Sequence, residues 1–332
     1  MIVVGFEGEK MAASSIVVGN EQTPWLGEFE TSEVLGQGAF GKVYLGKSQK
    51  SGQEVAVKVI NLEAADEDFE DIQLEISILA NMRHPNIVSY FGSFVNSNEL
   101  WIIMEYLNVG SCRDVLDLKM VFPEDCVVYI VHQLLLALVY VHRDLRVHRD
   151  IKAANMMMHA DGTVKLVDFG VAAQMSHRAT KHTFVGTTFW IAPEVCKGFG
   201  YNHKADIWSA GITIIEMTHG TPPYSELDPM KVLHLIPKAK PPVLEGSSSK
   251  LLKDLVAKML IKDHKDRPDS PALLKHKIFA KVDKKKPPVL AFIQKYRDTK
   301  AAKAAEKASS SSSDSKPLPP PQEEQEDWVF DD

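Results

Sequence analysis

The sequence contains few cysteines and no apolar run long enough to cross a membrane. Cys112, Cys126 and Cys196 are odd in number, widely spaced and in no metal-ligand spacing, which fits buried thiols in a reducing compartment. The most apolar stretch, Val127 to Val141, is interrupted by polar residues and is shorter than the roughly 20 residues that a bilayer requires. We predict a buried core helix there, and no membrane partner.

The chain also lacks a block of charge of one sign. Its formal net charge is −6 with both signs spread along 332 residues, which argues against nucleic acid as a main partner. The short apolar stretch Ile2 to Val4 is too brief for a secretory signal. We therefore expect a cytoplasmic protein in which residues 1–28 form a disordered extension, with Met11 as an alternative start that the sequence leaves open.

Two regions of different composition follow this extension. From Phe29 to Ile60, short β-branched runs alternate with glycine turns and predict an antiparallel meander. A helix containing Ile76 and two more strands, near Ile87 to Phe91 and Leu100 to Glu105, are expected next. After Gly110 long apolar helices dominate, and we expect them at Glu124 to His142, Ala205 to His219 and Lys250 to Leu260. The fold class is therefore α+β, with a small sheet lobe (29–107) and a larger helical lobe (108–282).

Residues 283–332 are predicted to form a tail. It begins with the lysine cluster Lys284 to Lys286, continues as a helix from Leu290 to about Lys307, and ends in serine-rich, proline-rich and acidic segments. From Ser309 onward the tail is too polar to fold alone. The lysine cluster is interpreted as a solvated linker, with a nuclear-import signal as the alternative.

The segment from residue 36 to residue 41 spells GxGxxG, with Gly36, Gly38 and Gly41 at the fixed positions. Dinucleotide-binding folds share this pattern, but in them a helix follows the third glycine, whereas here Lys42 to Leu45 continues as a strand. We therefore predict a glycine-rich hairpin. Without a Cβ atom, its backbone N–H groups can approach phosphate oxygens closely.

Lys58 lies on the next strand, at the end of Val55-Ala56-Val57-Lys58. This is the position expected for a lysine that holds the α- and β-phosphates of a nucleotide, although an isolated strand lysine is usually solvated. Glu75 lies three residues after Ile72 and four before Leu79, on the apolar face of its predicted helix. Because a carboxylate on a core-facing stripe needs a cation, we predict an ion pair between Lys58 and Glu75.

The loop from His148 to Asn155 places Asp150, Lys152 and Asn155 close together. Phosphoryl transfer needs a carboxylate that orients and deprotonates a hydroxyl, a cation near the γ-phosphate and an oxygen ligand for magnesium, which these residues supply in that order. A second His-Arg-Asp tripeptide, His142 to Asp144, lacks the following lysine and asparagine, so we interpret it as a helix end and turn.

Asp168 begins an Asp-Phe-Gly tripeptide directly after the predicted strand Val164 to Val167. In isolation such a tripeptide would be a plain turn. Because it follows a strand and comes soon after Asp150 and Asn155, we predict that Asp168 binds the magnesium that bridges the phosphates.

Together these elements resemble the eukaryotic protein kinases, over residues 29–282. Later landmarks of that family are present as Ala192-Pro193-Glu194, as the segment from Asp206 to Gly211 and as Asp266-Arg267-Pro268. The resemblance implies a bilobal protein kinase fold. It also implies that Glu194 pairs with Arg267 and that Asp206 braces the catalytic loop.

More narrowly, the segments from Leu100 to Leu107, from Thr183 to Thr187 and from Ser225 to Leu233 are similar to the sterile-20-like kinases, specifically germinal centre kinase subgroup III. This resemblance implies a gatekeeper at Met104 and backbone hydrogen bonds to adenine from Glu105 and Leu107. The apolar residues around the adenine ring would be Leu35, Val43, Ala56 and Met157.

The activity implied is transfer of the γ-phosphate of ATP to protein serine or threonine, with Mg2+ and with Mn2+ as an alternative. Lys152 and Gly186-Thr187 resemble serine/threonine kinases and differ from tyrosine kinases. Thr188 and Ile191 stand where relatives carry proline and methionine, which leaves the peptide preference open. Phosphorylation of Thr183, clamped by Arg149, is expected to activate the enzyme in intracellular signalling.

The resemblance implies protein substrates as partners, and a scaffold protein and a second copy of the chain are two further possible partners. Trp328-Val329-Phe330 in the acidic tail resembles peptides with which some relatives engage a helical-repeat scaffold, and a homodimer is an alternative for this family. The rival functions are a pseudokinase, which Lys58, Asp150 and Asp168 argue against, and a small-molecule kinase.

Overall fold

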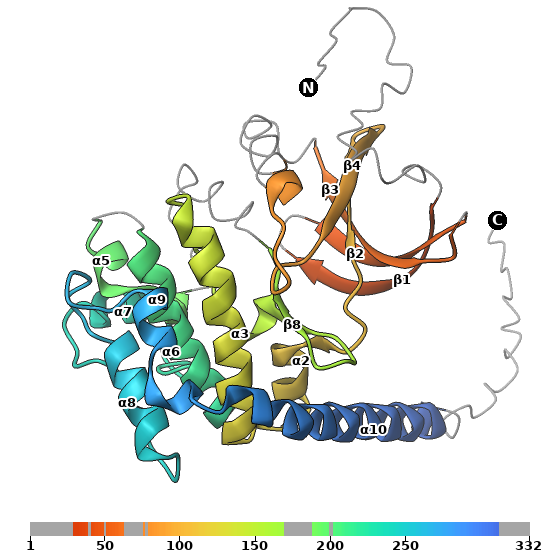
Figure 1. Ribbon diagram of the computed structural model, residues 1–332. Helices are drawn as coiled ribbons and strands as arrows, with labels where there is room; N and C mark the ends of the chain where they lie inside the picture. Colours follow the sequence, from red (N-terminus) through yellow and green to blue (C-terminus); the bar gives the residue numbers. More distant parts are fainter. Residues whose placement is uncertain are drawn as a thin grey trace, which may run out of the picture.

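The structure is a computed structural model, and it describes residues 29–38, 41–49, 51–62, 76, 79–168, 188–198 and 202–311. A small lobe made of a β-sheet lies above a larger lobe made mainly of helices (Figure 1). This arrangement confirms the predicted α+β class with two lobes.

Five antiparallel strands form the small lobe in the spatial order β1-β2-β3-β5-β4. They are β1 (Phe29–Gly38), β2 (Gly41–Ser48), β3 (Glu54–Asn61), β4 (Tyr90–Asn96) and β5 (Glu99–Glu105). The first three strands form the predicted meander. The fourth strand overlaps the one expected near Ile87 to Phe91 but begins three residues later, at Tyr90. Ile87 instead forms an isolated bridge with Leu166, and Val88 N–H donates to the Leu166 carbonyl at 3.0 Å.

The two faces of the sheet differ in what they bury. Val55, Val57, Val59 and Ile103 form a separate apolar cluster on one face. Successive side chains on a strand point to opposite sides, so Lys58 of β3 projects from the other face. That face is turned toward the helical lobe, as its contact with Asp168 shows.

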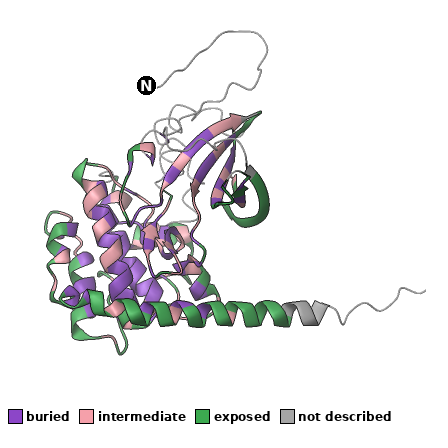
Figure 2. Ribbon diagram, turned by 45° about the vertical axis from the view of Figure 1, so that its right-hand side comes forward, coloured by how far each residue is buried: buried purple, intermediate pink, exposed green. Residues whose placement is uncertain are grey.

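The helical lobe is built around α3 (Glu124–Arg143) and α6 (His203–His219), with α8 (Lys250–Met259) packed on α6. All three helices lie within two residues of their predicted bounds. The start of α6 is fixed by the Asn202 side chain, which accepts from Lys204 N–H, and its end by Gly220 at φ 90°. Figure 2 shows that buried residues concentrate inside this lobe.

Among the helices of the described residues, α3 is long and apolar enough to cross a membrane, by length and composition alone. Its most apolar part is 61% buried inside the fold, and Val127, Ile130 and Leu138 are inaccessible to solvent. The prediction of a buried core helix for Val127 to Val141 is confirmed.

Short elements connect these helices and shape the surface between the lobes. A second sheet combines β6 (Gly110–Ser111), β7 (Met156–Met158) and β8 (Val164–Leu166). The short α-helices are α2 (Cys112–Asp117), α5 (Pro193–Cys196), α7 (Pro229–Leu235) and α9 (Ser270–Leu274). The 3-10 turns are η2 (Ala153–Asn155), η4 (Thr188–Trp190), η5 (Lys277–Phe279) and η6 (Val282–Lys285).

The last helix, α10 (Lys286–Ser311), is longer than the helix expected from Leu290 to Lys307. Val289, Ile293 and Tyr296 are buried, and α10 packs against α3, whereas the residues that follow Tyr296 are mostly exposed (Figures 1 and 2). Lys285, just before the helix, pairs with Asp125 of α3. The first half of α10 is therefore part of the packed lobe.

The three thiols are free. Cys112 and Cys126 are fully buried, and Cys196 is partly buried. Burial raises the pKa of Cys126 and of Cys196 to about 12. Because the thiolate is the reactive form, these thiols behave as small apolar side chains, as expected from the sequence.

Candidate active site

Strand register places several predicted nucleotide-binding residues on one face of the small lobe. Val43 pairs with Lys58, and Ala56 pairs with Met104. Directly opposed residues of antiparallel strands point to the same side, so these four side chains share the face turned to the helical lobe. Leu35 of β1 is 38% exposed, as an apolar residue at the open edge of a binding cleft can be.

The segment after β5 supplies the backbone groups predicted to contact adenine. Glu105 N–H donates to the Ser89 carbonyl at 2.9 Å, so the Glu105 carbonyl is the group that can accept from a base. The Glu105 side chain pairs with Lys165 Nζ at 2.7 Å, which ties this segment to β8 of the large lobe. Leu107 is buried, and Met157 lies half-buried on β7.

The glycines of the hairpin differ in what surrounds them. A Cβ atom on Gly36 would meet no atom within 4 Å, so the space above it is open. A Cβ atom on Gly41 would lie 1.9 Å from the Val59 carbonyl oxygen, so β3 itself requires glycine there. Gly38 pairs with Gly41 at the end of the β1-β2 ladder.

Lys58 and Asp168 join the two lobes at the site. Lys58 Nζ donates to Asp168 Oδ1 at 2.7 Å. Although loss of hydration acts in the opposite direction, the charge and hydrogen bond of Lys58 lower the pKa of Asp168 below its usual value. Glu75, the predicted partner of Lys58, lies outside the described residues.

The catalytic loop brings its three predicted residues together. Lys152 Nζ lies 2.9 Å from Asp150 Oδ2, and Asn155 Nδ2 donates to the same oxygen at 2.8 Å and to the Asp150 carbonyl at 2.7 Å. Because the amide nitrogen of Asn155 donates to Asp150, its amide oxygen remains as the atom that can bind a cation. The loop therefore combines a carboxylate, an ammonium group and a metal-binding oxygen.

Asp206 of α6 holds the start of this loop, as the resemblance implied. Its carboxylate accepts from the backbone N–H groups of His148, at 2.8 Å, and of Arg149, at 2.9 Å. Arg149 has φ 73°, a left-handed conformation that is strained for a residue with a side chain. The two hydrogen bonds hold the backbone in this conformation just before Asp150.

Sequence reasoning missed a third contact of Asp206. His142 Nε2 lies 2.8 Å from Asp206 Oδ2, and His142 Nδ1 lies 3.2 Å from Ser270 Oγ. The tripeptide from His142 to Asp144 does end α3, as predicted, but its histidine also joins three helices. Nothing in the local sequence points to this contact, because Asp206 and Ser270 are distant in the chain.

Glu216 of α6 is a second residue that the sequence analysis did not select. Its side chain is 1% exposed, and its Oε2 accepts from Ala153 N–H and from Trp190 Nε1–H, each at 3.0 Å. The sequence does contain a sign of this role, because Glu216 lies within the apolar run from Ile214 to Met217. A carboxylate buried in such a run requires hydrogen-bond or charge partners.

Behind the site, Glu194 and Arg267 form the ion pair implied by the resemblance. Arg267 donates from two nitrogens to the two Glu194 oxygens, at 2.7 and 3.0 Å, and both side chains are buried. The Arg267 guanidinium also lies 5.2 Å from the centre of the Trp208 ring. This pair anchors α5, which follows directly after the η4 turn.

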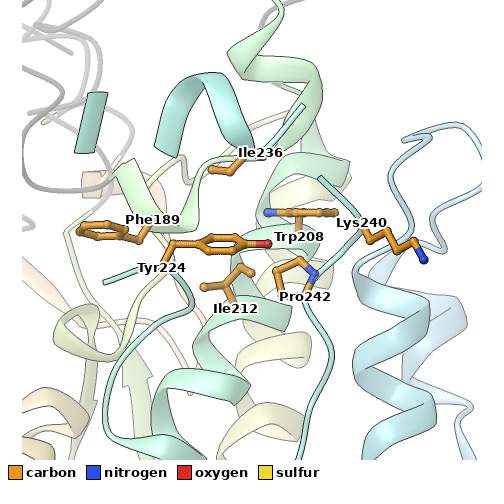
Figure 3. Close-up of a pocket in the computed structure, with 7 residues that line it drawn as sticks. All are labelled: Phe189, Trp208, Ile212, Tyr224, Ile236, Lys240 and Pro242. Atoms are coloured by element: carbon orange, nitrogen blue, oxygen red, sulfur yellow. The ribbon is translucent and has the colours of Figure 1, made fainter. Parts of the chain in front are cut away.

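A small pocket lies beneath η4, between α6 and the segment that follows α7. Figure 3 shows the rings of Trp208 and Tyr224 close together in it, while Lys240 extends away. Its volume of about 10 Å³ holds at most one water molecule, so it is no nucleotide site. It is lined by Phe189, Trp208, Ile212, Tyr224, Ile236, Lys240 and Pro242.

Two oxygen donors of the site suit magnesium. Mg2+ prefers carboxylate and carbonyl oxygens and is bound in phosphoryl-transfer sites by one or two protein side chains together with phosphates and water. Asp168 and Asn155 offer such a donor set. Within the described ranges no group of three or more His, Cys, Asp or Glu side chains has metal-binding geometry. Thr183, predicted to be regulatory, lies outside the described residues.

Comparisons with known proteins agree with this geometry. Residues 29–279 match the protein kinase domain family. The chain is 46% identical over 256 residues to serine/threonine-protein kinase ppk11 of Schizosaccharomyces pombe, covering 76% of this chain and 82% of that protein. It is 44% identical over 257 residues to Sporulation-specific protein 1 of Saccharomyces cerevisiae, covering 76% of this chain and 52% of that protein. With serine/threonine-protein kinase 1 of Arabidopsis thaliana it shares 37% identity over 304 residues, 90% of this chain and 36% of the relative.

Proposed function

The chain belongs to the protein kinase family, and from that premise we propose that it transfers the γ-phosphate of ATP to serine or threonine hydroxyls of proteins, with Asp150 as catalytic carboxylate. The arrangement of Asp150, Lys152 and Asn155 on one loop supports this most strongly. The sequence resemblance to sterile-20-like kinases is consistent with the relatives found.

The catalytic step assigns each residue a distinct task. The Asp150 carboxylate orients the substrate hydroxyl and accepts its proton as the bond from oxygen to the γ-phosphorus forms and the bond to the β-phosphate oxygen breaks, releasing ADP. Lys152, 2.9 Å from Asp150, stabilises charge on the transferred group, and Lys58 holds the α- and β-phosphates. Asp168 and Asn155 would hold Mg2+, or Mn2+, which suits the same donors, and the bound metal would supply positive charge against the phosphates.

The test compares two aspartates in identical tripeptides. Asp150→Asn keeps the shape of the side chain but removes the proton acceptor, so kcat should fall by about 100-fold or more. Asp144→Asn changes the exposed aspartate of the His142 to Asp144 tripeptide and should leave kcat near wild type. Phosphate incorporation into a basic protein substrate is measured by mass spectrometry. Full activity in Asp150→Asn would refute the assignment, and no turnover by wild type would favour the pseudokinase.

Regulation by Thr183 is the second part of this proposal. A phosphate there would gain bidentate hydrogen bonds from Arg149, whose backbone is already fixed by Asp206. Thr183→Ala should lower activity, and Thr180→Ala serves as the matched control. A fully active Thr183→Ala enzyme would refute this switch.

Location and partners complete the proposal. We propose that the enzyme acts in the cytoplasm, in intracellular signalling. Trp328 and Phe330 would anchor it to a helical-repeat scaffold protein, and a homodimer is a further assembly. Deletion of residues 322–332 should abolish scaffold binding in a pull-down. Sedimentation of the full chain tests the dimer, and cell fractionation tests the location.

A further inference from the structure

The carboxylate of Glu216 lies between two segments that border the site of the substrate hydroxyl. Its Oε2 accepts from Ala153 N–H, next to Lys152 in the catalytic loop, and from the indole N–H of Trp190 in η4. A protein substrate that reaches Asp150 has to pass close to these segments, because Lys152 contacts Asp150 directly. Glu216 is thus a negative charge at the border of the peptide site.

Arg113 of α2 lies on the solvent side of this carboxylate. Its NH1 atom is 3.8 Å from Glu216 Oε1, and the Arg113 side chain is 39% exposed whereas that of Glu216 is 1% exposed. Arg113 also contacts Asp117 through Nε, at 2.9 Å, and through NH2, at 2.8 Å. The pair of Arg113 and Asp117 is exposed and one helical turn apart, so it contributes little stability. Because Arg113 contacts Glu216 and is much more exposed than it, the guanidinium separates Glu216 from solvent.

The electrostatics of the cluster depend on this cation. Burial raises the pKa of Glu216, while the two N–H donors and the positive charges of Arg113 and Lys152 act in the opposite direction. Of these two cations, Lys152 is committed to Asp150 at 2.9 Å. Removing Arg113 would leave Glu216 short of positive charge, a deficit that an arginine or lysine from a bound peptide can fill.

We propose that Arg113 determines substrate specificity by occupying the position in which a basic residue of a protein substrate would otherwise pair with Glu216. The enzyme consequently does not favour arginine or lysine at that substrate position. The inference rests on the proposed function, because it concerns the protein substrate of that same site. It assigns Arg113 no part in the chemical step.

The test measures whether replacing Arg113 makes the enzyme select peptides that contain arginine. A series of serine peptides carries a single arginine moved one residue at a time along both sides of the serine, with an arginine-free parent. For each enzyme variant, the kcat/KM for every peptide is divided by the kcat/KM of the same variant for the arginine-free parent peptide. Arg113→Leu should prefer arginine about threefold to tenfold at one position, the one that faces Glu216, whereas wild type should show no preference for arginine at that same position. Arg143→Leu, at the exposed end of α3, is the matched control and should behave as wild type.

Further variants identify the acid responsible. In the Arg113→Leu background, Glu216→Gln should abolish the gain and Asp117→Asn should retain it. Arg113→Lys keeps a cation over Glu216 and should show no gain. Persistence of the gain after Glu216→Gln would assign it to another acid and overturn the proposal.

A binding measurement separates this inference from the proposed function. The same peptides with alanine in place of serine bind without phosphate transfer, and their affinities are measured by fluorescence anisotropy. A gain in affinity for an arginine peptide in Arg113→Leu supports the proposal even if no enzyme variant transfers phosphate. Equal preferences of wild type and Arg113→Leu in the binding assay would overturn it even if the kinase is fully active.

Discussion

Asp206 controls the backbone at the catalytic loop through a single side chain. Its two oxygens accept from His148 N–H and Arg149 N–H, and Oδ2 also contacts His142 Nε2. The left-handed backbone of Arg149 costs on the order of 1–2 kcal/mol, which these hydrogen bonds offset. Asp206 is fully buried and touches no predicted substrate atom, so it positions Asp150 without reacting.

Asp206→Asn should therefore affect both folding and turnover. The amide keeps the size of the side chain but presents an NH2 group to neighbouring N–H donors, so the free energy of unfolding should fall by about 3 kcal/mol. We expect kcat to fall more than KM rises, because Asp150 is misplaced rather than the nucleotide site. Urea unfolding and steady-state kinetics measure the two effects. Asp298→Asn, on the exposed side of α10, is the control, and equal behaviour of the two variants would refute the role of Asp206.

The buried His148 makes the free energy of unfolding depend on pH. Burial lowers the pKa of its imidazole below the ordinary 6.5. The unfolded chain then binds more protons than the folded protein between these two pKa values, so the free energy of unfolding falls as the pH drops from about 7.5 to about 5.5. The lowered pKa of Asp206 acts only near its ordinary 3.8 and below. Urea unfolding at both pH values should show a smaller loss for His148→Gln than for wild type, and an unchanged loss would contradict the assignment.

Among the helices, α10 connects the tail to the part of the large lobe that lies next to the segment after Leu107. A Cβ atom on Gly162 would lie 3.1 Å from Leu290, and one on Gly110 would lie 3.8 Å from the Tyr296 hydroxyl. Phe292 packs against Phe122 with ring centroids 5.0 Å apart. The helix therefore supports the turn between β7 and β8 and the segment directly after Leu107.

Tyr296→Ala tests whether this helix stabilises the lobe. Tyr296 is 1% exposed, and removing a large buried aromatic ring costs about 3–5 kcal/mol in the free energy of unfolding. Arg297→Ala, which changes the exposed neighbour, should alter it by less than about 0.5 kcal/mol. Thermal unfolding of both variants measures the difference. A Tyr296→Ala protein as stable as wild type would mean that α10 is not packed on the lobe in solution.

Across the entire protein, contacts between the two lobes position the side chains that would bind the nucleotide. Lys58 of the sheet reaches Asp168, and Leu166 N–H donates to the Asn86 carbonyl at 2.9 Å. Together with the pair of Glu105 and Lys165, these contacts link the small lobe to β8. The phosphates of ATP would lie between the two halves, so binding of ATP and magnesium should stabilise the fold as a unit.

A thermal-shift experiment with Asp168→Asn tests this coupling. Wild type should gain stability with a non-hydrolysable ATP analogue, and more with the analogue plus Mg2+, by RT ln(1 + [L]/Kd). Asp168→Asn removes a charged metal ligand and the charge partner of Lys58, so the additional Mg2+-dependent shift should disappear while the metal-free shift remains. Asp161→Asn, on the exposed turn between β7 and β8, is the control. An unchanged Mg2+ effect in Asp168→Asn would exclude it as the metal ligand.

Elements and chemical groups that depend on short spacing could be predicted from the order of the residues alone. The strand that follows Gly41, the loop from Asp150 to Asn155 and the aspartate after β8 are local patterns, because turn geometry and residue type fix them within a few positions. The strand expected from Ile87 begins only at Tyr90, because Ile87 and Val88 contact Leu166 of β8 instead of joining the main sheet.

Which distant groups meet depends instead on how the helices and strands pack together. Arg113 and His142 carry no local signal, and the contact of each with an acid of α6 depends on the packing of α2 and α3 against that helix. The packing of α10 was equally invisible, since an amphipathic stretch does not specify the surface that it covers. Local propensities act between near neighbours in the chain, whereas partners of buried charges are selected by the whole fold.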